Sequence, residues 1–316
     1  MAMPLVETKN LKKYFKTGAG MLHAVEDVNL EIMPGKTLGV VGESGCGKST
    51  LGRTILRLQP ATSGEVLYNG ENILKYKGKD MQKIHLNMQM VFQDPYSSLD
   101  PRMSVHNLIA EPVQVCGLLK TKAEINEHVR EIMDMCGLPA DQANLFPHEL
   151  DGGLRQRVGL ARAMAVSPKF IVCDEPVSAL DVSIQAQILN LLMDLQEQRE
   201  LSYMFITHDL CVVKHISNEI MVMYMGQVVE HAKTAELFAN PVHPYTKALL
   251  HAVPTIDLSK RNREGFMLRG EVTSPINPAP GCRFAPRCPY ATDKCKENVC
   301  LKEVSPDHFV ACSLCD

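Results

Sequence analysis

A short glycine-rich segment, residues 42–49, constrains the fold of this chain more than any other feature. It reads Gly-Glu-Ser-Gly-Cys-Gly-Lys-Ser and fits the pattern G-x-x-x-x-G-K-[ST]. An apolar run at 38–41 predicts a buried strand before it, and helical spacing from 50 to 58 follows it. In such a strand–loop–helix unit, backbone N–H groups converge on phosphate oxygens at the helix N-terminus. We therefore expect a phosphate-binding loop; the alternative is a glycine turn without a ligand.

The residue types of this loop suit a nucleotide, and ATP with Mg²⁺ is the first choice. Lys48 would reach the β- and γ-phosphates, and the hydroxyl of Ser49 would bind Mg²⁺. The candidate nucleotide-binding residues of the segment are Gly42, Glu43, Ser44, Gly45, Cys46, Gly47, Lys48, Ser49 and Thr50.

A second, acidic anchor for Mg²⁺ follows a predicted buried strand at 170–173. Asp174 would hold the ion through water, and Glu175 would polarise the attacking water. A solvated strand end is the alternative, but the following Pro176 and the run 178–181, Ser-Ala-Leu-Asp, argue against it.

Charge and hydropathy exclude some classes of protein. The formal net charge of −3 gives no attraction to nucleic acid or to an anionic membrane, and we see no long basic patch. No apolar stretch approaches the roughly 18–20 residues of a membrane helix. Residues 1–10 lack a basic-then-apolar signal pattern. We expect a cytosolic chain that docks on a membrane protein.

Local patterns predict alternating strands and helices, which indicates a mainly parallel α/β sheet. Residues 97–165 have a helical pattern, and beyond about 236 the composition shifts toward Pro, His and Cys. We therefore expect a domain over 1–235 and an extension over 236–316. The other predicted elements are strands around 28–32 and 203–206, hairpins at 67–71 and 221–230, and a helix at 184–195.

With these motifs, residues 5–235 resemble the ATPase subunits of ABC transporters. The resemblance implies an α/β P-loop NTPase fold: a RecA-like core with a mixed or parallel sheet, an antiparallel β subdomain, and a helical subdomain at about 97–165. It implies that Gln93 touches Mg²⁺ and senses the transporter, and that His208 contacts the γ-phosphate. It also matches Asp181 to the D-loop and Phe15 to the aromatic residue that stacks on adenine, with Tyr14 as the alternative.

One motif departs from the family pattern Leu-Ser-Gly-Gly-Gln. Residues 150–154 read Leu-Asp-Gly-Gly-Leu, so Asp151 and Leu154 replace the serine and glutamine. In the family this signature, including the glycines here at Gly152 and Gly153, grips the nucleotide held by the partner ATPase. Asp151 is either a helix cap that replaces serine without harm, or an anion that repels the partner's γ-phosphate; we favour the second interpretation.

The chain has eleven cysteines, six of them after residue 281. In a reducing compartment such a cluster suggests a metal rather than disulfides. Segments 243–250 and 281–289, with 94–101, resemble the oligopeptide/dipeptide importer ATPases. That resemblance implies a [4Fe–4S] cluster on Cys282, Cys288, Cys295 and Cys312; zinc and unliganded thiols are the alternatives, and Cys300 and Cys315 are extra.

The resemblance implies an ATP-hydrolysing, energy-coupling subunit of a binding-protein-dependent importer for di- or oligopeptides. Its expected partners are a second, paralogous ATPase, two transmembrane permeases and, indirectly, an extracytoplasmic solute-binding protein, with no nucleic acid. The expected location is the cytoplasmic face of the cell membrane, as a peripheral protein. Nickel, glutathione or an oligosaccharide is the alternative solute, and a soluble ABC ATPase acting on DNA or ribosomes is the alternative function.

Overall fold

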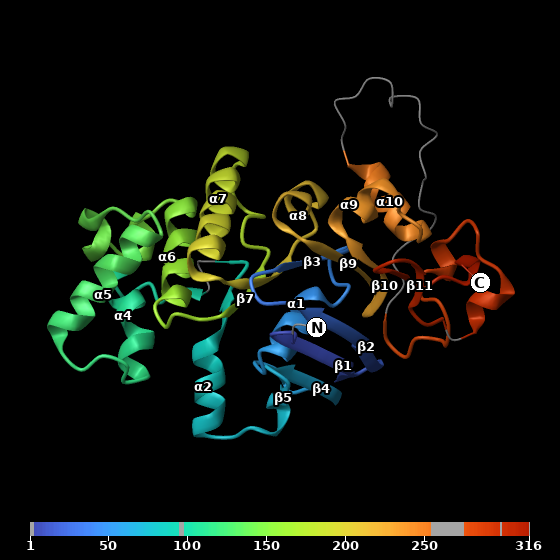
Figure 1. The fold of residues 1–316 in the computed structure, drawn as a ribbon, viewed down its shortest axis with the longest axis horizontal. Helices are drawn as coiled ribbons and strands as arrows, with labels where there is room; N and C mark the ends of the chain where they lie inside the picture. The colour runs from blue at the N-terminus through green and yellow to red at the C-terminus, as the bar shows by residue number, and fades with distance from the viewer. Residues whose placement is uncertain (1–2, 95–97, 254–274, 298, 316) are drawn as a thin grey trace. The chain divides into compact units, whose positions relative to one another are not determined.

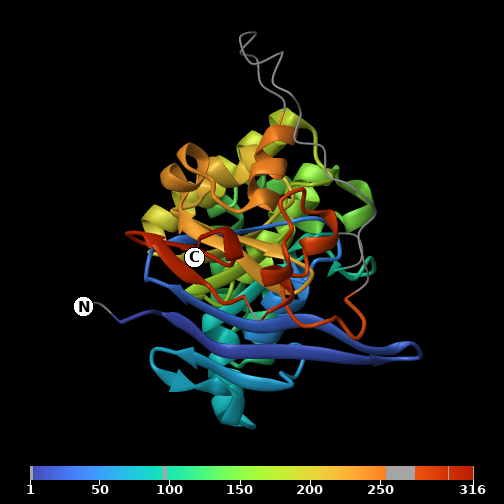
Figure 2. The same cartoon turned by 90° about the vertical axis from the view of Figure 1, so that its right-hand side faces the viewer.

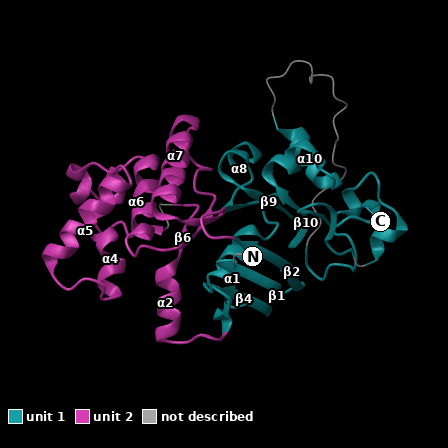
Figure 3. Cartoon of the chain, viewed as in Figure 1, with its two compact units in different colours: residues 1–32, 37–74, 205–316 teal, residues 33–36, 75–204 magenta. Residues whose placement is uncertain are grey.

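The computed structural model of the chain describes residues 3–94, 98–253, 275–297 and 299–315 (Figure 1). The chain divides into two compact units (Figure 3). The first comprises Met1–Ile32, Thr37–Leu74 and Phe205–Asp316, and the second comprises Met33–Lys36 and Lys75–Met204. Residues 95–97 of the expected 94–101 motif lie outside the described residues.

Four strands of the first unit form an antiparallel sheet in the order β2-β1-β4-β5. Their bounds are β1 Val6–Thr17, β2 Gly20–Ile32, β4 Ser63–Tyr68 and β5 Glu71–Asn72. β1 and β2 make a long hairpin (Figure 2), in which Val6 pairs with Ile32. The expected Asn-Gly turn joins β4 to β5: Asn69 and Gly70 have φ of 50° and 79°, which this kind of turn requires.

Five further strands of the first unit follow the order β11-β12-β10-β9-β3. Their bounds are β3 Thr37–Val41, β9 Glu219–Tyr224, β10 Gln227–Lys233, β11 Lys302–Ser305 and β12 His308–Val310. β3 is parallel to β9, whereas β10 is antiparallel to both β9 and β12. The helices of this unit are α1 Lys48–Ile55, α8 Leu210–Ile216, α9 Thr234–Ala239 and α10 Pro244–Ala252.

A buried carboxylate in β10 holds the last part of the chain to this sheet. Glu230 has no exposed surface, and its oxygens accept hydrogen bonds from the N–H groups of Val242 and His243 at 2.8 and 2.9 Å. In β12, Nε2 of His308 lies 2.8 Å from the same carboxylate. Since a buried charge needs such partners, these contacts tie β12 and the start of α10 to β10.

The second unit is mainly helical. Its helices are α2 Lys79–Asn87, α4 Val105–Val115, α5 Lys122–Met135, α6 Gly152–Met164 and α7 Val182–Arg199. Its strands β6 Met88–Val91 and β7 Phe170–Asp174 are parallel. The boundary with the first unit falls within β8 Ser202–Ile206, between Met204 and Phe205. A capping box of Thr121 and Glu124 begins α5, whose buried residues Val129, Ile132 and Met133 share one face.

The structure confirms the α/β class and the expected strands, hairpins and helices. It also contains elements that the sequence patterns did not predict: the strands β1, β6, β11 and β12, and the helices α2, α8, α9 and α10. Among the described residues, no helix has both the length and the apolar character that crossing a membrane requires. The division at about residue 235 stays a prediction.

Candidate active site

The glycine-rich loop has the backbone conformation that its sequence predicts. It connects β3 to α1, and Gly47 caps the N-terminus of α1 with φ of 106°, in the left-handed region. A Cβ atom at Gly47 would lie 2.0 Å from the carbonyl oxygen of Ala24, so only glycine fits there. Gly45, also left-handed with φ of 78°, has no atom within 4 Å of its Cβ position and is exposed. The loop thus forms a cradle closed against β2 on one side.

Lys48 places a buried positive charge inside this loop. The side chain is 4% exposed, and Nζ donates hydrogen bonds to the carbonyl oxygens of Gly42 at 2.8 Å and Glu43 at 3.0 Å. No acidic residue lies in the first turn of α1, whose N-terminal end is itself electropositive. Lysine, helix end and glycine backbone together fit a phosphate chain.

Two residues from the far end of the chain contact this loop, and the sequence analysis did not find them. The hydroxyl of Tyr245 accepts a hydrogen bond from the N–H of Glu43 at 2.8 Å. Nη1 of Arg287 lies 2.8 Å from Oε2 of Glu43. Both lie within stretches that resemble the importer ATPases, but no local pattern pairs them with residue 43.

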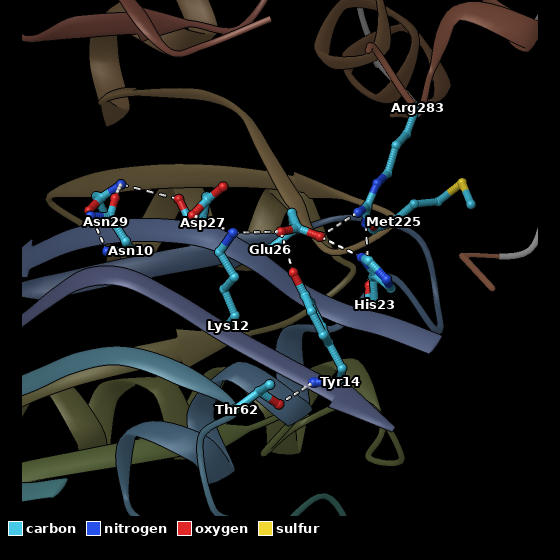
Figure 4. A network of polar contacts seen from close by, with 10 residues as sticks. All are labelled: Asn10, Lys12, Tyr14, His23, Glu26, Asp27, Asn29, Thr62, Met225 and Arg283. Atoms are coloured by element: carbon cyan, nitrogen blue, oxygen red, sulfur yellow. Dashed lines mark hydrogen bonds and ion pairs between the residues drawn. The ribbon is translucent and has the colours of Figure 1, made fainter. Parts of the chain in front are cut away.

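The two candidate adenine-stacking residues lie side by side in β1 but have different surroundings. The ring of Tyr14 stacks on that of His23 with centroids 4.0 Å apart, and its hydroxyl donates to Glu26 at 2.6 Å (Figure 4). Burial, with Glu26 next in effect, raises the pKa of Tyr14 to about 12. Phe15 instead has Nζ of Lys13 4.6 Å from its ring centroid. Tyr14 is thus committed to a polar network, whereas Phe15 takes no part in it.

Glu26 is the centre of that network. Its carboxylate contacts Tyr14, Nδ1 of His23 at 2.6 Å, Nζ of Lys12 at 3.3 Å and Nη2 of Arg283 at 2.9 Å (Figure 4). Burial alone would raise the pKa of Glu26, but the hydrogen bonds from Tyr14, His23 and Lys12 outweigh it and lower the pKa. The carboxylate is therefore a stable anion.

His208 also belongs to the first unit. It is exposed and follows β8, directly before Asp209, whose carboxylate caps α8 by accepting from the N–H of Cys211 at 2.7 Å. This cap fixes the backbone next to His208 and leaves the imidazole at the surface.

The acidic candidates and Gln93 lie in the second unit. Asp174 ends β7 and is fully buried. Glu175 has φ of 47°, a strained value for a non-glycine residue and one often found at functional sites. Nε2 of Gln93 donates to Oε2 of Glu175 at 3.0 Å. The structure thus brings together two of the three expected catalytic residues.

The divergent signature begins α6. Asp151 is its N-cap, and Oδ1 accepts from the N–H of Leu154 at 2.8 Å. Gly152 is exposed and Gly153 is buried; a Cβ atom at Gly153 would lie 2.7 Å from the side chain of Ile184. Asp181, the expected D-loop residue, is exposed at the N-cap of α7.

The structure does not support the iron–sulfur cluster expected on Cys282, Cys288, Cys295 and Cys312. All four are described and unpaired, yet no group of three or more His, Cys, Asp or Glu residues within the described ranges is arranged to hold a metal ion. The thiol of Cys295 instead contacts Oγ of Ser313 at 3.2 Å. Burial raises the pKa of Cys282 to about 11 and raises the pKa values of Cys288 and Cys312. Burial alone would also raise the pKa of Cys295, but hydrogen bonds with Ser313 and Thr292 outweigh it and lower that pKa.

Comparisons with known proteins give the same picture over nearly the whole chain. Residues 25–178 match the ABC transporter family, and residues 229–295 match the oligopeptide/dipeptide transporter C-terminal region. The oligopeptide transport ATP-binding protein AppF of Bacillus subtilis is 47% identical over 320 residues, covering 98% of this chain and 97% of that protein. OppF of the same organism is 48% identical, covering 99% and 97%.

Solved structures agree. CbiO1 of Clostridium perfringens, part of the ABC transporter complex cbiONQ, has a TM-score of 0.67 at 26% identity, covering 75% of this chain and 92% of that one. The ATP-binding cassette MJ0796, solved as a dimer with ADP and Pi, has a TM-score of 0.66 at 30% identity, covering 72% and 98%. With relatives this similar along its length, the chain belongs to the ABC transporter family and is an ABC-type ATPase whose ATP hydrolysis is coupled to transport.

Proposed function

We propose that this chain energises the uptake of di- or oligopeptides as one ATPase subunit of a binding-protein-dependent importer. The observation that carries the proposal is the similarity to oligopeptide transport ATP-binding proteins over 98% of the chain, including the C-terminal region. The subunit would sit at the cytoplasmic face of the membrane, beside a paralogous ATPase and two permeases, and would act with an extracytoplasmic solute-binding protein only indirectly.

The residues divide the work of binding and hydrolysis. The backbone of residues 42–50 and the Lys48 ammonium would hold the phosphates, and Phe15 would stack on adenine. Ser49, Gln93 and Asp174 would hold Mg²⁺, which neutralises charge that develops on the phosphates. Glu175, oriented by its hydrogen bond from Gln93, would polarise the attacking water, and His208 would contact the γ-phosphate.

Reconstitution tests the proposal. The chain, its paralogue and the two permeases are purified together, placed in vesicles, and supplied with ATP, the binding protein and a labelled peptide. We expect peptide uptake that Lys48→Ala abolishes and that Lys9→Ala, which removes an exposed lysine, leaves unchanged. ATP-driven uptake of nickel, glutathione or an oligosaccharide instead of peptide would correct the solute. The proposal would be overturned if the chain did not associate with the permeases and instead bound DNA or ribosomes.

We further propose that the two ATP sites of the assembled transporter are unequal. Asp151 caps the N-terminus of α6 in place of the family serine. Unlike serine, it adds a negative charge to the signature. Two unit charges about 4 Å apart repel by roughly 4 kcal/mol at an effective dielectric of about 20, and Mg²⁺ and lysine would screen part of this. The ATP site formed by the partner's phosphate loop and this chain's signature would then be weakened. The other site, formed by this chain's phosphate loop and the partner's intact signature, would be fully active.

Restoring the family residues tests this inequality. Asp151→Ser with Leu154→Gln keeps a capping oxygen and removes the charge, so we expect higher ATPase turnover in the assembled transporter. The matched control, Asp151→Asn, keeps the size and cap of the side chain while removing only its charge, and should give part of the gain. Turnover and ATP affinity that do not change in either variant would refute the inequality.

A further inference from the structure

The second residue of the phosphate loop is held twice, both times by the C-terminal segment, by which we mean α10 and residues 281–297. Tyr245 at the start of α10 accepts from the Glu43 N–H, and Arg287 pairs with the Glu43 carboxylate. Arg287 is 7% exposed, and its Nη1 also lies 3.4 Å from the hydroxyl of Tyr224 in β9. A charge-assisted hydrogen bond with one partner this buried is among the stronger contacts in proteins.

An aromatic cluster fixes the two residues that hold Glu43. Phe284 is 1% exposed, and its ring centroid lies 5.2 Å from that of Tyr224 and 5.4 Å from that of Tyr245. Tyr224 and Tyr245 are themselves 4.8 Å apart in an edge-on arrangement. Because such clusters pack rigidly, Arg287 and the hydroxyl of Tyr245 have defined positions rather than those of mobile surface groups.

A second arginine of the same segment contacts the β1–β2 hairpin. Arg283 donates to the carbonyl oxygens of Met225 and His23 and pairs with Glu26 (Figure 4). Glu26 in turn binds the hydroxyl of Tyr14, whose ring stacks on His23. The backbone that follows His23 packs directly against Gly47 of the loop. Arg283 therefore braces the β1–β2 hairpin, which also carries Phe15, the expected adenine-stacking residue, directly after Tyr14.

We propose that the C-terminal segment is a working part of the nucleotide site: Arg287 positions the phosphate loop, and Arg283 positions the Tyr14–His23 stack beside the base. This inference rests on the assignment of residues 42–50 as the ATP-binding loop, and it does not depend on which solute is transported. Neither arginine touches the nucleotide itself; each is a positioning residue that acts through a carboxylate.

The phosphate arm is tested by the affinity of the purified full chain for a fluorescent ATP analogue. We expect Arg287→Gln to raise Kd about tenfold, the loss typical of one charged hydrogen bond. Lys296→Gln removes a cation of the same segment from an exposed pair with Asp293 and should leave Kd unchanged. In a Glu43→Gln background, Arg287→Gln should change Kd less than about twofold, because its partner charge is already gone.

The base arm is tested by the ratio of ATP to GTP affinities. Arg283→Gln should change this ratio, because it loosens the surface beside the base. Arg287→Gln should weaken both nucleotides equally and leave the ratio as in the unmodified chain. Thermal unfolding without nucleotide is measured in parallel, since lost packing lowers the unfolding midpoint and the active fraction but not the Kd of folded molecules.

Several results would overturn the inference. One is an unchanged Kd for Arg287→Gln, whatever happens to its unfolding midpoint; another is an equal effect of Arg287→Gln with and without Glu43→Gln. If Arg287→Gln does not fold, Tyr245→Phe keeps the ring in the cluster and removes only the acceptor for the Glu43 N–H; it should also raise Kd, and an unchanged value refutes the proposal. Absence of ATP binding by the unmodified chain would instead refute the loop assignment.

Discussion

Replacing Phe284 with alanine should loosen the C-terminal segment more than any other single truncation there. Phe284 is 1% exposed and packs against Tyr224, Tyr245 and the ring of His243, whose centroid lies 5.7 Å away. Truncating a buried phenylalanine costs about 3–5 kcal/mol, because the lost burial adds to the cavity left behind. We expect Phe284→Ala to lower the local stability by this amount, and Phe284→Leu, which fills most of the space, by less than about 1.5 kcal/mol.

Hydrogen exchange is the suitable assay, because a chain with two compact units need not unfold in one step. The amides of α10 and of 285–287 should exchange faster in Phe284→Ala, while those of α5 in the other unit should not change. Tyr290→Ala serves as the control, since Tyr290 is 52% exposed and its loss should cost no more than about 0.5 kcal/mol. Equal protection in Phe284→Ala and Tyr290→Ala would refute the packing argument.

Three further expectations concern the loop, a buried histidine and the signature helix. Gly47→Ala should abolish ATP binding because its Cβ meets a carbonyl at 2.0 Å, while Gly45→Ala, with open space, should only weaken it; equal binding by both variants would contradict this. Burial lowers the pKa of His243 from 6.5 to about 3, so the unfolded chain takes up a proton first as the pH falls. The free energy of unfolding should therefore drop by about 1.4 kcal/mol per pH unit as the pH falls between these values. Urea unfolding at several pH values should show a smaller drop for His243→Gln than for the unmodified chain. Asp151→Ala should destabilise α6 by about 0.5–2 kcal/mol and Asp151→Ser by far less, as judged by urea unfolding; equal losses would show that the cap is not what matters.

Local sequence patterns predicted the strands and helices that are determined by the spacing of apolar residues within a short segment. The continuous apolar run 170–173 became β7, and the 3.6-residue spacing of Ile125, Val129 and Ile132 became α5. The short helices α8, α9 and α10 were missed because six to nine residues give little periodicity. Their starts carry readable signals only in hindsight, such as the proline at the first position of α10.

The candidate site likewise has a part that local sequence predicts and a part that depends on contacts between residues far apart in the sequence. The conformation of the glycine-rich loop could be predicted directly, because its glycines and Lys48 lie within eight residues of sequence. The pairing of Glu43 with Arg287 could not, since 244 residues separate them and neither has a periodic pattern around it. The cysteine cluster shows the converse error: a count of thiols suggested a metal site, but coordination depends on the directions of the sulfur atoms and on their protonation, which spacing does not determine.

The hydrogen bonding of β12 to β10 has a consequence for any shortened form of this protein. Residues 308–310 cover the outer side of β10, and Lys302–Ser305 adds one more short strand. The pair of Lys233 with Asp307 lies beside these strands. A chain ending before residue 300 would expose the β10 backbone as an open sheet edge and leave Glu230 without the imidazole of His308. Open edges recruit strands from other molecules, so such a fragment should self-associate, and the last residues protect the chain's solubility as well as its shape.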